Sequence, residues 1–270
     1  MYPKRGIGTL NVTPRHKPVC FGLQFVESHI QKTTNQELNL EFFEVVQKRR
    51  SIRRFTEQQI SDDLILKALE AAILAPNSSN TQTWDFHWIK SAEMKSELVK
   101  ICLDQSAAKT ANQLVVVTAD PKLWKRSQQS LIEWAERSKA PKGVKMYYEK
   151  IVPLMYRWGF LNLLAPIKSL MYFSAGLFRP TPRGPGSRRD SQEVAIKSAA
   201  LAAENFVLAV TAQGAATCMM EGFDECRLKR LLKLKSSARI LMVIGIGYEA
   251  ERGTWGERER LPFNEVVHVH

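Results

Sequence analysis

Residues Ile240–Gly247 read ILMVIGIG, a continuous apolar run that is rich in β-branched side chains. Such a run is typical of a strand that is buried on both faces of a sheet. Leu114–Thr118, with the sequence LVVVT, is a second run of this kind. Trp84, Phe86 and Trp88 alternate with other residues, which indicates a third strand. We therefore expect a sheet built from these three segments.

Helical patterns occupy much of the chain around these strands. Ser61 is followed by two aspartates, which suit the positive end of a helix dipole, and by an apolar face that runs on towards Pro76. An Ala-rich segment ends at Gly214, and its small side chains allow close packing against a neighbour. The predicted helices are Leu38–Gln47, one from Ser61 to before Pro76, Glu193–Gln213 and Glu225–Lys235. This order is not a strict alternation of strands and helices, so it favours an α+β fold over a doubly wound sheet.

Composition excludes several classes of protein. The chain has 270 residues, 44% of them hydrophobic, which is enough for a sizeable core and excludes a disordered chain, a collagen and a coiled-coil rod. Its four cysteines form no CxxC pair, so we expect neither a structural zinc site nor a disulfide framework, and no metal. Free thiols and the lack of a secretory signal pattern predict a cytoplasmic protein.

Positive charge is concentrated in one central segment. The formal net charge is +12, and residues 121–190 hold 14 Lys or Arg against 4 acidic residues. Within them, Ile151–Phe178 is unusually apolar, but charges at Arg157 and Lys168 interrupt it, so we do not expect a membrane-spanning helix. Two short apolar helices around Pro166 could form a lid, a partner surface or an interfacial anchor. Residues 180–190, rich in Pro, Gly and Arg, predict a loop.

Arginines gather at two distant places in the sequence. Arg49–Phe55 reads RRSIRRF and offers four guanidiniums and a hydroxyl within six positions. Because guanidinium groups bind phosphate through paired N–H donors, this turn could hold an anion, although a solvated basic turn has the same composition. Arg258 and Arg260 form a second pair, which could equally be an exposed strand end bridged to Glu257 and Glu259.

Two further segments carry polar or flexible groups. Ser78–Trp84 reads SSNTQTW, and the amides of Asn80 and Gln82 are both donors and acceptors, as the polar edge of a heterocycle requires. A helix cap followed by a loop would also explain this segment. Gly214–Phe223 leaves a helix, passes through an extended stretch and reaches a Glu-Gly turn, where Gly222 permits close approach of a flat ring.

Together these four segments, in this order, resemble the motifs of the nitroreductase family of flavoproteins. The resemblance runs from about Phe42 to Val267 and includes MMEGFD and the ending GERERLPFNEVV. It implies an α+β fold with a central, mainly antiparallel sheet surrounded by helices, in an intertwined homodimer. It also implies a domain from 37 to 270, an N-terminal extension 1–36, and an insertion 124–190 that could act as a lid.

The resemblance also implies a cofactor and roles for individual residues. The cofactor would be FMN, with NADH or NADPH as electron donor. No side chain would be the catalytic acid, base or nucleophile, since the flavin carries the chemistry. Arg53 is a candidate to tune the flavin. The residues implied in cofactor binding are Arg49, Arg50, Ser51, Arg53, Ser78, Asn80, Gln82, Met220, Glu221, Gly222, Arg258 and Arg260. Asn80 and Gln82 would reach the flavin of the other subunit.

The implied activity is a ping-pong reduction of nitroaromatics, quinones or related small-molecule acceptors. A reductive dehalogenase or another specialised flavoenzyme of the same fold is an alternative. In the insertion, aromatic side chains could stack on a substrate or simply pack: Tyr147, Tyr148, Tyr156, Trp158 and Phe160. An alternative of another class is a basic peripheral protein that meets a membrane surface through 151–178. Nucleic-acid binding is not expected, because aromatics do not interleave with the arginines.

Overall fold

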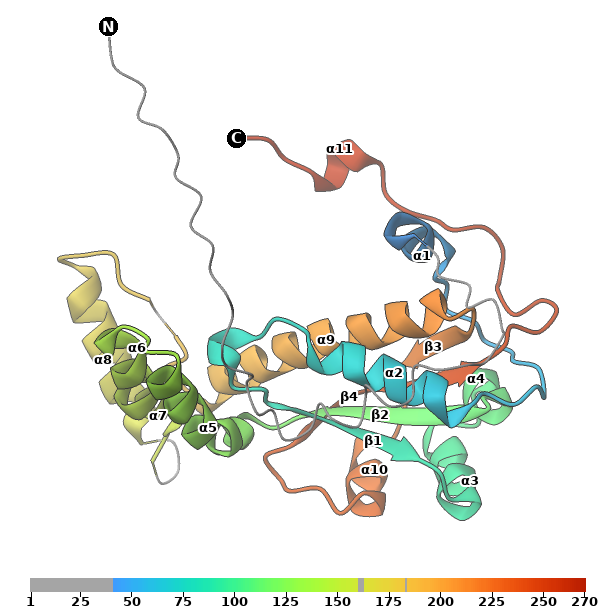
Figure 1. Cartoon of the computed structure of the whole chain (residues 1–270), viewed down its shortest axis with the longest axis horizontal. Coiled ribbons are helices and arrows are strands. Elements are labelled where there is room, and N and C mark those ends of the chain that lie inside the picture. The colour runs from blue at the N-terminus through green and yellow to red at the C-terminus, as the bar shows by residue number, and fades with distance from the viewer. Residues whose placement is uncertain (1–40, 160–162, 183) are drawn as a thin grey trace, which may run out of the picture. The chain divides into compact units, whose positions relative to one another are not determined.

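The computed structural model describes residues 41–159, 163–182 and 184–270 (Figure 1). The predicted N-terminal extension 1–36 and the start of the predicted helix Leu38–Gln47 lie outside these residues. The rest of that helix is present as α1, Phe42–Lys48.

One antiparallel sheet forms the centre of the described part, with the strand order β1-β2-β4-β3. Its strands are β1 (Trp84–Ile89), β2 (Gln113–Ala119), β3 (Ala216–Met220) and β4 (Arg239–Gly247). The three predicted strands are confirmed, and β3 is the extended stretch expected after Gly214. The α+β class is confirmed as well, because helices cover an antiparallel sheet (Figure 1).

Both faces of the sheet are covered, which explains why the central strands are continuously apolar. Val115 and Val117 on β2 face one core with α2 and α9, whereas Leu114 and Val116 face a second core with α3, α4 and α10. All four side chains are fully buried. Successive residues of a strand point to opposite faces, so all four positions from Leu114 to Val117 need apolar side chains.

The other helices are α2 (Asp62–Ile73), α3 (Ala92–Ile101), α4 (Ser106–Thr110), α5 (Trp124–Arg137), α6 (Lys142–Met146), α7 (Val152–Tyr156), α8 (Leu164–Gly176), α9 (Arg188–Ala212), α10 (Glu225–Leu231) and α11 (Phe263–Val266). The N-cap predicted at Ser61 is present, since its hydroxyl accepts a hydrogen bond from the backbone N–H of Leu64. Short 3₁₀ turns occur at Ser78–Asn80 and Pro121–Leu123, and a π-helical turn at Tyr147–Ile151 joins α6 to α7.

The long helix α9 begins five residues earlier than its pattern predicts. The loop predicted at 180–190 is therefore wrong at its end, where Arg188–Asp190 form the first turn. Ser187 and Asp190 make a capping box in which each side chain accepts a hydrogen bond from the other residue's backbone N–H. This local pairing stabilises a helix start that the surrounding glycines and prolines conceal.

The alanines of α9 are buried against α2 and the sheet, as their small size predicts. Ala195, Ala199 and Ala202 have no exposed surface. Among the described residues, α9 is the helix that is long and apolar enough to cross a membrane by length and composition. Because its alanines pack in the core, we interpret α9 as the central helix of the fold and not as a membrane span.

The region predicted as an insertion folds into α5, α6, α7 and α8, at one end of the sheet (Figure 1). Trp124, Val152 and Tyr156 form a small core of their own. Pro166 does not separate two helices as predicted, because it lies in the first turn of α8. A proline is tolerated there, since the first backbone N–H groups of a helix have no carbonyl partner.

Candidate functional site

The turn Arg49–Phe55 is fixed to the sheet by its apolar residues. The Phe55 side chain packs against Gly247, the last residue of β4. A Cβ atom at position 247 would lie 2.8 Å from the Cβ of Phe55, so only glycine leaves room for Phe55 there. The backbone N–H of Ile52 donates to the carbonyl of Thr217 on β3 at 2.9 Å. Because Ile52 and Phe55 are buried, the arginines between and before them are left on the surface.

The two distant arginine pairs converge. Arg258 donates to the carbonyl oxygens of Val46 at 3.2 Å, of Gln47 at 2.7 Å and of Arg49. These carbonyls lie at the C-terminal end of α1, where the helix leaves them without partners. Arg258 thereby caps α1 and ties the C-terminal segment to the turn.

A second contact closes the same arrangement, because the guanidinium of Arg50 donates to the carbonyl of Gly256 at 2.7 Å. The pKa of Arg258 is lowered by burial and then by the positive charges of Arg49, Arg260 and Arg50. We call these four residues the arginine cluster. The turn and the C-terminal pair therefore lie side by side.

No acidic residue of the described chain forms an ion pair with the arginine cluster, although Glu249 lines the same cavity as Arg49 and Arg50. The alternative of a strand end bridged to Glu257 and Glu259 is therefore wrong within these residues. Four like charges held close together repel one another, and a bound anion would relieve that repulsion.

Ser51 and Arg53 lie on the sheet side of the cluster. Ser51 pairs with Thr217 as an isolated bridge next to β3. The guanidinium of Arg53 lies 4.1 Å from the ring centroid of Trp255. Burial raises the pKa of the Cys218 thiol, and the charge of Arg53 acts in the opposite direction. Trp255 is a residue that sequence reasoning missed, because nothing near it in the sequence indicates a contact with residue 53.

Met220, Glu221 and Gly222 lie at the other end of β3. The Met220 side chain is buried, so it presents only its backbone to the surface. The carbonyl of Gly222 accepts a hydrogen bond from the Gln105 side-chain amide at 2.5 Å. A Cβ atom at position 222 would lie 3.0 Å from that nitrogen, so a side chain there would crowd Gln105. Gln105 is a second residue that the sequence motifs did not indicate.

The third set, Ser78, Asn80 and Gln82, lies apart from the arginine cluster. The backbone N–H of Ser78 donates to the Ser198 hydroxyl in the first half of α9. Arg49 instead lines a cavity of about 90 Å³ with Thr211, in the last turn of the same helix. Thirteen residues of helix separate Ser198 from Thr211, which is about 20 Å. Within one chain, the two sets are not brought together.

The backbone of this third set is strained. Ser79, Asn80 and Gln82 have positive φ angles of 56°, 48° and 48°. Residues other than glycine adopt this conformation at a cost, and such strain gathers at functional sites. The contacts of the insertion help to hold the loop, since Tyr147 and Ser79 share a hydrogen bond of 2.5 Å between their hydroxyl groups.

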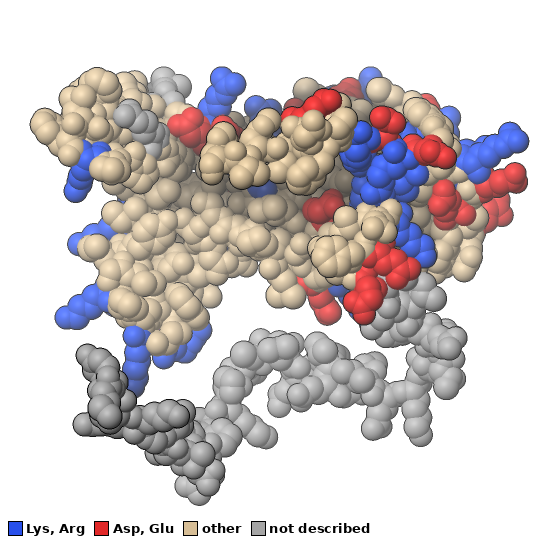
Figure 2. Space-filling model, turned by 90° about the horizontal axis from the view of Figure 1, so that it is seen from above, with Lys and Arg blue, Asp and Glu red and all other residues tan. Residues whose placement is uncertain are grey.

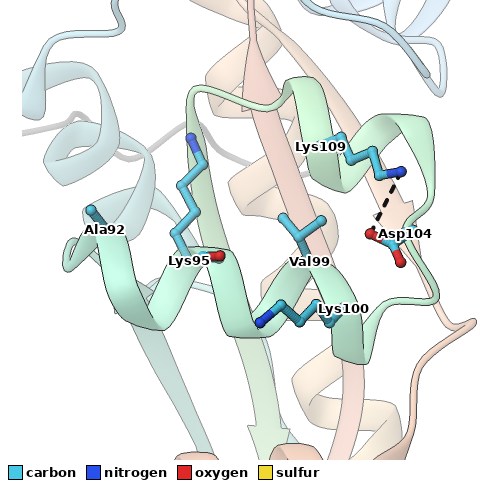
Figure 3. Close-up of a pocket in the computed structure, with 7 residues that line it drawn as sticks. Ala92, Lys95, Val99, Lys100, Asp104 and Lys109 are labelled. Carbon is cyan, nitrogen blue, oxygen red and sulfur yellow. Dashed lines mark ion pairs between the residues drawn. The ribbon is translucent and has the colours of Figure 1, made fainter.

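Another cavity, of about 350 Å³, lies between α3 and α4 and is lined by three lysines (Figure 3). Each lysine has a partner. Lys109 pairs with Asp104 at 3.5 Å, Lys100 pairs with Glu97 at 3.3 Å, and Lys95 donates to the carbonyl of Asn112 at 3.0 Å. Because these charges are already engaged, this cavity is a weaker anion site than the arginine cluster.

Comparison with known proteins identifies one family. The model of the nitroreductase family matches residues 46–248. A putative NAD(P)H nitroreductase of Streptococcus pyogenes is 27% identical over 230 residues, which cover 84% of this chain and 98% of that protein. A putative NADH dehydrogenase/NAD(P)H nitroreductase of Archaeoglobus fulgidus is 39% identical over 85 residues, 32% of this chain and 49% of that protein.

A crystal structure of a putative nitroreductase in complex with FMN, from Exiguobacterium sibiricum, has the same fold. It superposes with a TM-score of 0.64 at 22% sequence identity, over 86% of this chain and 98% of the other. At this identity the likeness concerns the fold, including the antiparallel sheet and its covering helices.

Proposed function

The chain belongs to the nitroreductase family, and from this membership we propose that it is an FMN-dependent oxidoreductase. NADH or NADPH is the electron donor, and nitroaromatics, quinones or related small molecules are the acceptors. The names of its relatives, which include NAD(P)H nitroreductases, and the FMN complex of a protein with this fold support the proposal.

The observation that carries the proposal is the arginine cluster, which forms no ion pair with an acidic residue of the described chain. Its guanidiniums fit the phosphate of FMN, because paired N–H donors match phosphate oxygens. Arg49 and Arg260 would bind the phosphate directly. The side chains of Arg50 and Arg258 hold carbonyls of distant segments, whereas Arg260 donates only to the carbonyl of its neighbour Glu259. Ser51, within the turn, would extend the same contacts to the ribityl chain.

β3 gives the direction in which the flavin would lie. The strand starts beside Ser51 and ends before Glu221 and Gly222, so backbone groups at its far end can meet the ring. When bound, FMN accepts a hydride and passes electrons to a second substrate in a ping-pong cycle. Arg49, Arg260 and Ser51 would bind the cofactor and orient it along β3.

The separation of the two sets of residues along α9 supports a homodimer with shared sites. Asn80 and Gln82 cannot lie beside the arginine cluster of their own chain, but a two-fold axis would bring them to that of a partner. Large apolar side chains that a monomer leaves exposed support the same assembly; they include Phe42, Phe43, Leu74, Leu201 and Phe263. Their burial between two subunits would be favourable.

Arg53 is our candidate for tuning the flavin. Its charge acts on Cys218 in β3, and it would stabilise the negative charge of reduced FMN. In protein fully loaded with FMN, Arg53→Ala should slow flavin reduction by NADH at least about tenfold, or about 1.4 kcal/mol. FMN affinity should fall less. Stopped-flow bleaching of the flavin absorbance measures the rate.

The control for Arg53 is Arg53→Lys, which keeps the charge and should recover part of the rate. Trp255→Phe keeps an aromatic ring against the guanidinium and should leave the rate near that of the wild type. Equal reduction rates in loaded Arg53→Ala and wild-type protein would refute the tuning role.

We also propose that the insertion 124–190, within a domain spanning 37–270, is a lid. It is fixed to the strained loop of its own chain: Arg126 donates to the carbonyl of Gln82 at 3.1 Å, and Ser127 to that of Thr81 at 2.9 Å. If this loop reaches the partner's flavin, the insertion must follow it there. Of the five aromatic candidates, Tyr156 and Trp158 are buried, Tyr147 and Tyr148 are half-buried, and Phe160 lies outside the described residues.

Removal of the Tyr147 hydroxyl group tests the proposed lid. Tyr147→Phe removes its hydrogen bond to Ser79 and should raise the KM for a quinone about fivefold, since a neutral hydrogen bond contributes about 1 kcal/mol. FMN affinity should stay unchanged. Tyr148→Phe is the control, because its hydroxyl makes no hydrogen bond within the described chain. A KM equal to that of wild type in Tyr147→Phe would argue against the lid.

A further inference from the structure

Helix α8 exposes an apolar face. Six large apolar side chains on the helix and at its ends are each more than half exposed: Leu163, Ile167, Leu170, Phe173, Leu177 and Phe178. With 3.6 residues per turn, all six fall on one side of the helix. That side carries no charged residue. A helix exposed to water normally presents its polar residues outwards, and α8 does the opposite.

The single charge of α8 is directed into the protein. Lys168 is 4% exposed, and its ammonium group donates to the carbonyl of Arg157 at 2.6 Å and that of Met155 at 3.3 Å. These carbonyls lie at the end of α7, so Lys168 caps that helix. The lysine therefore fixes α8 with its apolar side outwards.

Basic residues surround this face. Arg157 precedes α8 and Arg179 follows it, and both are exposed and form no ion pair within the described chain. Of the four acidic residues in 121–190, Glu136 and Glu149 pair with Lys145, and Asp190 caps α9. Figure 2 shows Lys and Arg side chains along the end of the molecule that carries α8, while most acidic side chains in this view lie at the other end.

We propose that α8 docks the protein on the surface of an anionic lipid bilayer. The exposed apolar side chains enter the boundary between headgroups and acyl chains, and the flanking arginines meet the lipid phosphates. With 13 residues, α8 is about 20 Å long, which is too short to span the hydrocarbon core of about 30 Å. It therefore lies in the plane of the interface.

The charge around α8 favours lipid over a second copy of this chain. A two-fold contact would place the same basic surroundings against themselves, and the like charges would repel. A bilayer containing anionic lipid neutralises them. The docking surface uses none of the residues assigned to FMN binding, although α8 belongs to the insertion that we propose as a lid.

Co-sedimentation with vesicles tests the docking surface. The FMN-loaded full chain is mixed with vesicles of phosphatidylcholine and phosphatidylglycerol, or of phosphatidylcholine alone. Wild type should bind the anionic vesicles at least about tenfold better, and high salt should weaken binding several-fold. The variant Ile167→Gln/Leu170→Gln/Phe173→Gln should lose binding about tenfold or more. Leu103→Gln, at an exposed leucine after α3, should bind as wild type.

Three outcomes would overturn the docking surface. Wild type could remain in solution with both kinds of vesicle, or the triple variant could sediment as wild type does. The triple variant could also change the oligomeric state in size-exclusion chromatography, which would assign α8 to a protein interface. FMN affinity measured without vesicles should be unchanged in the triple variant, because its three residues lie outside the arginine cluster. This measurement separates failure of docking from failure of the proposed activity.

Discussion

Replacing Arg258 with glutamine should lower the affinity for FMN about 100-fold. The substitution removes one charge from the arginine cluster and the hydrogen bonds that hold the end of α1 to the C-terminal segment. Hydrogen bonds to charged groups contribute about 1.5–3 kcal/mol each, and about 1.4 kcal/mol corresponds to a factor of ten in affinity. Titration of the apoprotein with FMN, followed by quenching of flavin fluorescence, measures the change.

Two variants separate the contribution of charge from that of position. Arg252→Gln removes the same charge from the same segment, but Arg252 lies outside the arginine cluster, so its FMN affinity should change less than about threefold. Arg258→Lys keeps the charge but lacks the planar fork that reaches several carbonyls, and it should fall between wild type and Arg258→Gln. An unchanged FMN affinity in Arg258→Gln would contradict binding of the FMN phosphate by the arginine cluster.

Two inactive variants should restore activity when their subunits are mixed. One variant carries Arg49→Ala and Arg260→Ala, and the other carries Asn80→Gly and Gln82→Gly. Glycine is used because positions 80 and 82 have positive φ angles, so it deletes the amides without adding backbone strain. Each homodimer should lose most of its NADH-dependent quinone reduction, because each of its sites lacks one half.

In a mixed dimer, one site carries both sets of substitutions and the other site carries none. Random reassortment makes about half of the dimers mixed, so the pool should recover about a quarter of wild-type activity. The subunits are exchanged by joint refolding or by co-expression with two affinity tags, and quinone reduction is measured. The same mixing with wild type in place of one variant is the control. No recovery in a tagged, purified mixed dimer would contradict the shared site.

The central strands and the main helix could be predicted because their signals are local. A continuous apolar run such as Ile240–Gly247 needs both faces of a sheet covered, and the structure covers them. Helix α5 carries a weaker signal, since only four of its fourteen residues are buried, and the start of α9 depends on a capping box among glycines and prolines. Such elements are decided by packing and by single hydrogen bonds more than by periodicity.

That Arg258 and Arg260 lie beside the turn Arg49–Phe55 could be predicted only from the order of the four family motifs in the sequence. Position 258 lies 209 residues from Arg49 in the sequence, and no local pattern shows that its guanidinium caps α1. The contacts of Trp255 with Arg53, and of Gln105 with Gly222, are likewise tertiary. They arise where the turn, the end of β3 and the C-terminal segment meet, which the sequence alone does not specify.

The left-handed loop at Ser79, Asn80 and Gln82 has a consequence for protein engineering. Each non-glycine residue in this conformation costs on the order of 1 kcal/mol, and glycine would adopt it freely. A search for heat-resistant forms of this enzyme would therefore find easy gains in this loop. Glycine at positions 80 and 82 would also remove the two amides that we propose to reach the flavin, so a screen for thermal tolerance should be paired with an assay of quinone reduction.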